Sequence, residues 1–378
     1  KEANQDCILF FRLGDFYEMF NEDAKLAARE LDLTLTTRDR GKPKEEQTPM
    51  CGVPYHSVDA YIARLVQKGY KVAICEQLED PKLVKGLVKR GVIELVTPGV
   101  VLGDNILPNK ENSFLASIYF GKNHTGVSFL DISTGEFFMA QGDDRYVDKL
   151  IASLQPKEVL YQRGMEDRFE SAFGGKHYTY RLDEWIFSSD LNYDKLCKQF
   201  GTQSLKGFGV EGMTEGIAAA GAILYYLEFT EHREISHIAS ISRIDQKDYV
   251  WIDKFSIRNL ELFSSSSGEA KTGFADVIDR TLTSMGGRML KRWVAMPLLD
   301  VKRIEARQDV VEAIATDADL AAALREQVAA IGDLERLSSR IAAGRILPRE
   351  LVQLKSSLIA VENLKALLES TDEQPLHD

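Results

Sequence analysis

The pattern of apolar residues changes along this chain, and the change limits the folds that are open to it. From Cys7 to about Gly99, short strand-like apolar runs alternate with helical patterns, which is typical of a mixed α/β domain. Pro98-Gly99 and Gly103-Asp104-Asn105 then mark a boundary. A second α/β unit follows, and beyond about Asp245 the pattern is mainly helical. We therefore predict two α/β domains and one all-α domain within the 378 residues, at 1–104, 105–244 and 245–378.

Apolar periodicity and capping residues place the expected elements. Thr283 or Ser284 can cap a helix, Asp300 can cap the next one, and Pro348 suits the first turn of the last. The period-two runs predict strands, and the period-3.6 runs predict helices. The expected strands are 8–13, 33–37, 71–75, 92–96, 114–119, 126–131 and 136–140, and the main helices are 16–30, 58–67, 144–154, 191–200, 216–230, 285–294 and 349–369.

An aromatic run near the start of the chain, Gly14 to Phe20, has two interpretations. In the first, Asp15 caps a helix that begins at Phe16, Glu18 reaches back to the cap, and Phe16 and Phe20 pack inward one turn apart. In the second, an exposed aromatic beside a carboxylate is a wedge for a stacked partner such as a nucleobase. Three aromatics cannot share one helix face, so at least one is displayed or packs on a neighbouring element, but the spacing does not decide which.

The charge balance argues against a nucleic-acid partner for the chain as a whole. A net charge of -11 and a pI near 5.2 predict repulsion from phosphate. Residues 1–100, however, carry 15 Lys and Arg against 16 Asp and Glu, so the acidic excess lies later. Two basic clusters could follow a nucleic-acid backbone, although solvated loop charge is the better interpretation of either cluster alone. They are Arg38, Arg40, Lys42 and Lys44, and Lys82, Lys85, Lys89 and Arg90.

The sequence shows no pattern for a disulfide, a metal site, a membrane span or a signal peptide. The four cysteines lie far apart and form no C-x-x-C pair, which suits reduced, partly buried thiols, and the six histidines form no cluster with ligand spacing. The sequence has no run of 18 apolar residues and no charged-then-apolar leader. We therefore expect a cytoplasmic protein with no membrane partner and no metal or cofactor site in this chain.

Three stretches look like enzyme motifs. Gly207 to Gly212 matches G-x-G-x-x-G, but no good strand precedes it, and Ser267 to Thr272 lacks the Gly that a phosphate-binding loop needs before Lys-Thr. The strand that carries Asp131 into a tight hairpin resembles the first hairpin of the ribonuclease-H-like fold. A carboxylate there can hold paired metals in active nucleases. A metal-dependent nuclease that uses Asp131 is thus an alternative to a plain turn, in which the Asp and the Ser-Thr-Gly sequence form the hairpin.

A series of blocks, taken in order, resembles the MutS family of DNA mismatch repair proteins. The resemblance covers nearly the whole chain, and the loop 39–47 is the main stretch that it does not reach. The blocks are Gly14-Asp15-Phe16-Tyr17-Glu18-Met19-Phe20, Pro49-Met50-Cys51-Gly52-Val53-Pro54-Tyr55-His56, Val72-Ala73-Ile74-Cys75-Glu76-Gln77, Val96-Thr97-Pro98-Gly99, Leu130-Asp131-Ile132-Ser133-Thr134-Gly135 and Met285-Gly286-Gly287-Arg288-Met289-Leu290-Lys291-Arg292-Trp293.

This resemblance implies a role for each predicted domain. It implies a mismatch-recognition domain, a ribonuclease-H-like connector without nuclease activity, and the first part of a helical core and lever. Phe16 matches the stacking wedge of the family, and Glu18 matches its base-contacting acid. Pro54, Tyr55 and His56 resemble the family's loop near the DNA backbone, although a Pro-led turn into the helix from Ser57 explains them about as well. Arg38, from the first basic cluster, is a further candidate for a backbone contact. The implied partner is mismatched double-stranded DNA.

The resemblance also implies features beyond these residues. The family's ATPase domain, which uses ATP and Mg, would lie past Asp378, so this chain is not expected to be an enzyme and no catalytic residue is expected in it. The family works as a homodimer and signals to MutL-like proteins. The connector helix expected at 191–200 is a candidate surface for that contact.

Overall fold

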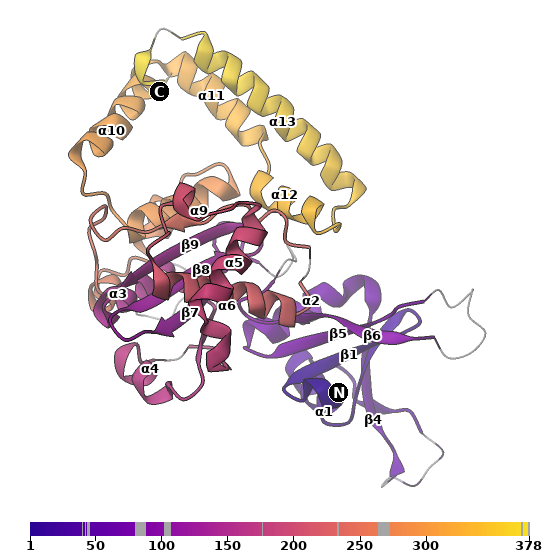
Figure 1. Ribbon diagram of the computed structural model, residues 1–378. Helices are drawn as coiled ribbons and strands as arrows, with labels where there is room; N and C mark the ends of the chain where they lie inside the picture. The colour runs from indigo at the N-terminus through magenta and orange to yellow at the C-terminus, as the bar shows by residue number, and fades with distance from the viewer. Residues whose placement is uncertain are drawn as a thin grey trace.

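The computed structural model describes residues 1–39, 41, 43, 46–79, 88–101, 107–175, 177–232, 234–263, 273–371 and 373–376. Figure 1 shows two α/β units side by side and an open frame of helices that rises from the second. The order is thus α/β, α/β and then helical, as predicted from the sequence. The predicted domain boundaries at 104/105 and 244/245 stay a prediction. Among the described residues, no helix is long and apolar enough to cross a membrane.

The first unit is a six-stranded sheet in the order β3-β4-β2-β1-β5-β6. β1 and β5 are parallel, and the other neighbours are antiparallel. The two helices cover one face, where Phe10, Met19 and Ile62 are buried in a common core. The strands are β1 (Cys7–Leu13), β2 (Phe16–Phe20), β3 (Thr36–Thr37), β4 (Pro49–Pro54), β5 (Lys71–Gln77) and β6 (Arg90–Val96), and the helices are α1 (Asn21–Leu31) and α2 (Val58–Gln67).

The aromatic run is a strand, so the predicted helix at 16–30 begins five residues too early. Gly14 has a φ of +58°, and with Asp15 it turns the chain into an antiparallel hairpin that pairs Leu13 with Phe16. Along β2, Tyr17 and Met19 are buried while Phe16 is exposed, which is the alternation of a strand. The cap by Asp15 and the capping box with Glu18 were therefore wrong. Sequence analysis also placed no strand at β4, and only the end of the predicted strand 33–37 forms β3.

The second unit is a sheet in the order β11-β10-β7-β8-β9-β12. An antiparallel meander of three strands is followed by parallel strands, as expected for a ribonuclease-H-like unit. The helix α3 begins and ends where it was predicted, because Asp143 caps it by accepting from the Tyr146 amide. The elements are β7 (Leu115–Phe120), β8 (Thr125–Asp131), β9 (Glu136–Gly142), α3 (Asp144–Leu154), β10 (Glu158–Gln162), α4 (Glu166–Ala172), β11 (Thr179–Leu182), α5 (Ser189–Phe200), α6 (Thr214–Phe229) and β12 (Ser242–Arg243).

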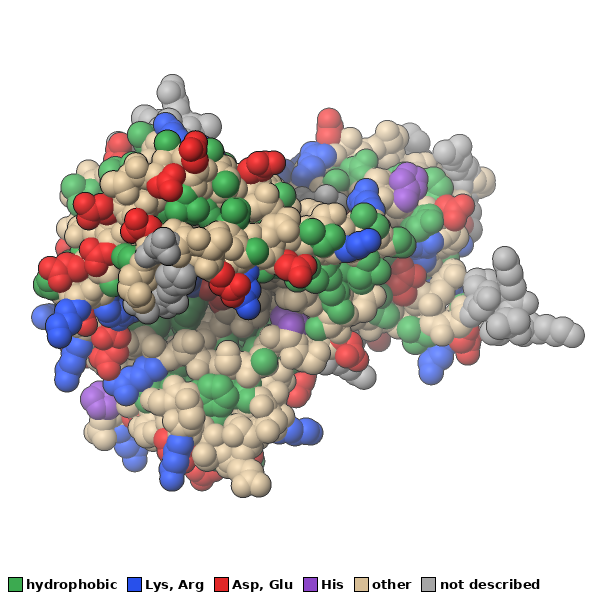
Figure 2. Space-filling view, turned by 90° about the horizontal axis from the view of Figure 1, so that it is seen from above, with side chains coloured by type: hydrophobic (Ala, Val, Ile, Leu, Met, Phe, Trp, Pro, Cys, Tyr) green, Lys and Arg blue, Asp and Glu red, His purple; other side chains and the backbone are tan. Residues whose placement is uncertain are grey.

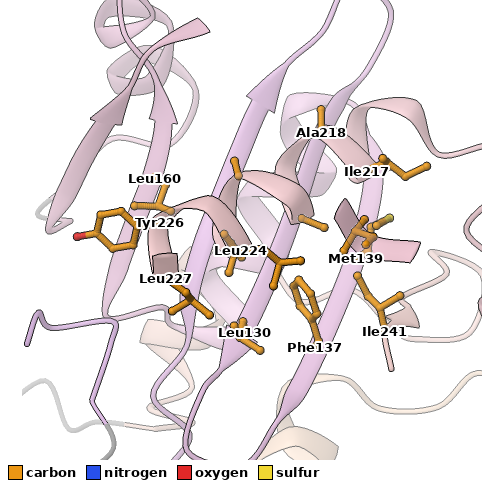
Figure 3. Close-up of a cluster of buried hydrophobic side chains, with 14 of the residues drawn as sticks. Leu130, Phe137, Met139, Leu160, Ile217, Ala218, Leu224, Tyr226, Leu227 and Ile241 are labelled. Atoms are coloured by element: carbon orange, nitrogen blue, oxygen red, sulfur yellow. The ribbon is translucent and has the colours of Figure 1, made fainter. Parts of the chain in front are cut away.

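The core of this unit lies between α6 and the sheet. Figure 3 shows Ile217, Leu224 and Leu227 of α6 among side chains of the neighbouring strands, including Leu130 and Met139. The helix approaches the sheet closely because Gly126 has no side chain. A Cβ atom at Gly126 would lie 2.0 Å from the carbonyl oxygen of Glu215. The four cysteines are free and buried, as the sequence indicated.

The open frame at the top of Figure 1 is formed by α10 to α13, in which α11 and α13 lie side by side, and α7 to α9 precede it in the chain. The predicted caps are confirmed, because Thr283 accepts from the Gly286 amide and Asp300 accepts from the amides of Lys302 and Arg303. Pro348 is the first residue of α13, as predicted. The helices are α7 (Lys254–Asn259), α8 (Phe274–Ile278), α9 (Ser284–Ala295), α10 (Val301–Thr316), α11 (Ala318–Ala330), α12 (Leu334–Ala342) and α13 (Pro348–Glu369).

One buried carboxylate joins all three parts of the chain. Glu94 of β6 is 6% exposed and lies 3.1 Å from His232 Nε2, just after α6. It also lies 2.8 Å from a guanidinium nitrogen of Arg345, between α12 and α13. Burial alone would raise the pKa of Glu94, but the hydrogen bond to His232 and the ion pair with Arg345 outweigh it and lower the pKa to about 2. We call Glu94, His232 and Arg345 the Glu94 junction. It holds the first sheet against the other two parts of the chain.

Candidate nucleic-acid interface

Phe16 stands at the end of the β1–β2 hairpin, beside the turn. Its side chain is 48% exposed, and in the described part of the chain its ring makes no ring-stacking or cation–π contact. Across the sheet Phe16 pairs with Leu13 on one side and with Pro54 on the other. The Tyr55 amide donates a hydrogen bond of 2.9 Å to the carbonyl oxygen of Asp15. The hairpin end is thus held on both sides and presents an aromatic ring to solvent.

Glu18 lies on the same face of the sheet as Phe16, because the two are separated by two residues of one strand. It pairs with Phe11 of β1 and with Gly52 of β4. Gly52 brings no side chain to this face, and a Cβ atom there would lie 3.5 Å from Cγ of Glu18. The carboxylate therefore has open space on the side of β4. This face is the one that α1 and α2 leave uncovered (Figure 1).

Two arginines flank Glu18 on the open face. The Arg38 guanidinium lies 5.9 Å from the ring centre of Phe20, and that of Arg90 lies 5.4 Å from the ring of Phe11. Phe20 and Phe11 share the face of Glu18 by strand alternation and cross-strand pairing. Each guanidinium therefore lies against an aromatic ring. Arg38 is exposed, whereas Arg90 is half-buried and also donates to the carbonyl oxygens of Arg12 and Val88 at 3.3 Å. We call Phe16, Glu18, Arg38 and Arg90 the open-face group.

The other predicted backbone contacts lie next to the hairpin end. Pro54 ends β4 opposite Phe16, and Tyr55 is 45% exposed in the short 3₁₀ helix Tyr55–Ser57 that leads into α2. His56 is exposed, and its ring meets the edge of the Tyr55 ring at 5.9 Å. Arg38 is not part of this corner, because it lies at the Phe20 end of the strand. Arg40, Lys42, Lys44, Lys82 and Lys85 fall outside the described residues.

Sequence reasoning missed three residues behind the hairpin. The Tyr17 hydroxyl donates a hydrogen bond to Glu76 of β5, and the Arg12 guanidinium lies 3.6 Å from the same carboxylate. Arg12 also lies 4.0 Å from the ring centre of Tyr55. We call Arg12, Tyr17, Tyr55 and Glu76 the hairpin support. A strand assignment for β2 would have placed Tyr17 on this side, opposite Phe16.

The carboxylate of Asp131 is part of the connector core and does not form an open metal site. It is fully buried, and its two oxygens accept from Asn112 Nδ2, the Ser113 amide, and the amide and hydroxyl of Ser133 at 2.7–3.1 Å. These four donors occupy the positions that metal ions would need. Among the described residues, no three His, Cys, Asp or Glu side chains are grouped as metal ligands. The nuclease alternative therefore has no support, and the turn interpretation accounts for Asp131.

We expect Asp131→Asn to lower the free energy of unfolding by about 2 kcal/mol, because the amide would point a donor at buried donors. Urea unfolding would measure this loss. Asp190→Asn, at an exposed position of α5, is the matched control and should change stability little. Magnesium-dependent DNA cleavage by the wild-type chain that disappears in Asp131→Asn would contradict this structural role.

The other two enzyme-like motifs carry no site. Gly207 to Gly212 lies between α5 and α6, where a short 3₁₀ helix rather than a strand accompanies it. A dinucleotide-binding turn follows a strand, so the motif lacks its required context. In the stretch from Ser267 to Thr272, all residues fall outside the described part of the chain.

The overall charge is distributed rather than concentrated. Figure 2 shows acidic and basic side chains interspersed over the face that it views. Much of the basic charge is also paired locally, as in the bond of 2.7 Å between Lys195 and Glu228. The net charge of -11 therefore does not set the local potential of the open face.

A six-stranded sheet that displays an aromatic ring and an acid, joined to a ribonuclease-H-like unit and a helical frame, agrees with three family models. Residues 1–105 match MutS domain I, residues 113–239 match MutS domain II, and residues 256–378 match MutS domain III. These matches lie in the same order as the three structural parts. They define the chain as a series of domains from one class of DNA repair protein.

Relatives that carry the name DNA mismatch repair protein MutS agree over the whole chain. One from Phocaeicola vulgatus is 52% identical over 365 residues, which cover 97% of this chain and 42% of the relative. One from Parabacteroides distasonis is 50% identical and covers 100% of this chain and 43% of the relative. The chain belongs to the MutS family. It spans less than half of the length of these relatives.

Proposed function

We propose that this chain is the part of a DNA mismatch repair protein that senses mismatched or unpaired bases in duplex DNA. The observation that carries the proposal is the exposure of Phe16 at a hairpin end, with Glu18 on the same face and arginines on either side. Family membership and the names of the relatives support it.

In this proposal Phe16 enters the minor groove and stacks beside a base. Insertion of an aromatic wedge requires unstacking and kinking of the duplex, which costs a few kcal/mol. The cost is smallest where base pairing is already broken. A mismatch is then recognised by how easily the duplex deforms rather than by a code of base letters.

Glu18 adds a second source of discrimination between a mismatch and a paired base. A carboxylate that approaches the phosphate backbone is repelled unless a base offers a hydrogen bond to it. An exposed base at a mismatch can offer that bond, whereas a paired base is less available. Glu18 therefore penalises insertion into a perfect duplex more than insertion at a mismatch.

Arg38 and Arg90 attract the phosphate backbone, whereas Glu18 repels it. Their guanidinium groups on the open face would contact phosphates and hold the duplex over Glu18 and Phe16. Pro54, Tyr55 and His56 would follow the backbone beside the hairpin end. These contacts give affinity without sequence information.

We expect Glu18→Ala to strengthen binding to perfect duplex and so to narrow the preference for a mismatch by about threefold to tenfold. Competition binding of mismatched and matched oligonucleotides to the full-length protein would measure both affinities. Glu22→Ala removes an acid from α1 that is 84% exposed in its side chain, and it should leave the ratio unchanged. An unchanged ratio for Glu18→Ala as well would reject its role.

The remaining functions of the family are proposals for the full-length protein. We propose that an ATPase using ATP and Mg lies outside these residues, that the protein acts as a homodimer, and that α5 of the connector contributes to a contact with a MutL-like protein. The chain alone should bind DNA weakly and in a salt-sensitive way, because a single arm lacks the avidity of a dimer.

A further inference from the structure

The hairpin support lies behind the wedge, on the side of the sheet opposite Phe16. Tyr17 follows Phe16 directly in β2, so its ring points to the other face, where it is 6% exposed. Its hydroxyl donates to Glu76 of β5, and Arg12 of β1, which pairs with Tyr17, lies between them. The three side chains therefore link β2, β1 and β5 in a row.

The same group also holds both residues of the hairpin turn. The Nε of Arg12 donates a hydrogen bond to the carbonyl oxygen of Gly14. The guanidinium of Arg12 stacks on Tyr55, and the Tyr55 amide donates to the carbonyl oxygen of Asp15. Gly14 and Asp15 are the turn that precedes Phe16. Movement of this turn would thus break contacts to Arg12, which is itself held by Glu76 of β5, and to Tyr55, the residue after β4.

The hydrogen bond from the Tyr17 hydroxyl to Glu76 helps to hold β2 in place. Burial of the ring and the hydrogen bond to Glu76 both raise the pKa of Tyr17, so the hydroxyl remains a neutral donor at physiological pH. A hydrogen bond to a carboxylate is stronger than one between neutral groups. The ring itself packs in the core of the sheet, where Phe10 lies 6.3 Å away. Loss of the hydroxyl alone would therefore leave most of the packing in place.

We infer that Tyr17, held by Glu76 and Arg12, is a positioning residue that keeps Phe16 rigidly presented for insertion. This inference rests on the proposed role of Phe16. A wedge discriminates between duplexes only if the duplex, and not the hairpin, yields when they meet. A hairpin that yields would let the ring turn away from both duplexes, so matched and mismatched DNA would be bound more alike.

A double-mutant cycle between Tyr17→Phe and Phe16→Ala tests the inference. The readouts are the affinities of the full-length protein for a mismatched and a matched duplex. Tyr17→Phe should lower the mismatch preference by about threefold to tenfold while the affinity for matched duplex changes less than about twofold. In the Phe16→Ala background the same substitution should have no further effect on the preference. Tyr61→Phe, on α2 against the same core, is the matched control.

Each outcome decides between the two claims. If Phe16→Ala leaves the preference intact, the proposed function fails. If Phe16→Ala abolishes the preference but Tyr17→Phe does not change it, only the positioning inference fails. If Tyr17→Phe lowers affinity for both duplexes equally, its effect is general and the inference is overturned. Glu76→Gln weakens the same hydrogen bond without changing Tyr17, so it should reproduce the loss of mismatch preference. It replaces Tyr17→Phe in the test if that variant folds poorly.

Discussion

Phe16→Ala should reduce the preference of the full-length protein for a mismatched duplex by about tenfold or more, because stacking of a base on an aromatic ring is worth about 1–3 kcal/mol. The loss should come from weaker binding to the mismatch, since a matched duplex resists insertion in either case. Competition binding against labelled mismatched DNA would measure the ratio.

The control for this variant is Phe255→Ala. Phe255 lies in α7 and is 59% exposed, so the substitution removes a ring of similar exposure far along the chain from the hairpin. It should leave the ratio of affinities unchanged. If Phe16→Ala changes both affinities equally, or neither, Phe16 does not act as a wedge.

Glu94→Gln should lower the free energy of unfolding by about 3 kcal/mol at neutral pH, because it leaves His232 and Arg345 at the Glu94 junction without their charged partner. The lower end of the usual range applies, since the Arg345 side chain is 42% exposed and can be hydrated. Urea unfolding would measure the loss. Glu228→Gln, at an ion pair where the glutamate side chain is 62% exposed, should have little effect.

The same junction predicts a dependence of stability on pH. The pKa of Glu94 is lowered from 4.5 to about 2 on folding. Its contribution is therefore fully present above pH 4.5 and is lost as the pH falls toward 2. The difference between the wild type and Glu94→Gln should shrink when urea unfolding is repeated at about pH 3.5. A difference that is equal at both pH values would show that the charge of Glu94 is not the stabilising feature.

Local patterns in the sequence were enough to predict several elements closely. The helix α2 begins and ends at the predicted residues, and the caps Thr283 and Asp300 form as expected. In these segments the apolar period and the capping residue indicate the same structure. The buried position of Asp131 also agrees with its turn interpretation, because the hairpin itself provides the Ser133 donors.

The sequence could not decide the structure of the aromatic run. Asp15 and Glu18 satisfy the pattern of a capping box, but Gly14 takes a left-handed turn that begins a strand instead. Pairing with β1 and β4 then outweighs local preference for a helix. The resemblance identified Phe16 and Glu18 as candidates, whereas their shared face became visible only with the strand.

Contacts between distant residues were beyond any local pattern. Glu94 lies 138 positions from His232 and 251 positions from Arg345, so their junction depends on how whole domains meet. The hairpin support has the same origin, because Tyr17 and Glu76 are 59 positions apart. Glu76 lies in a block that resembles the family, but the block alone gives it no role.

The central claim is that the Phe16 ring contacts a base at the mismatch. Replacement of Phe16 by a photoreactive benzoylphenylalanine, followed by irradiation with DNA and mapping of the cross-linked nucleotide, tests this most directly. We predict cross-links to the mismatched base or its stacking neighbours, with much lower yield on matched duplex. Cross-links of equal yield to both duplexes, or spread along the backbone away from the mismatch, would contradict it.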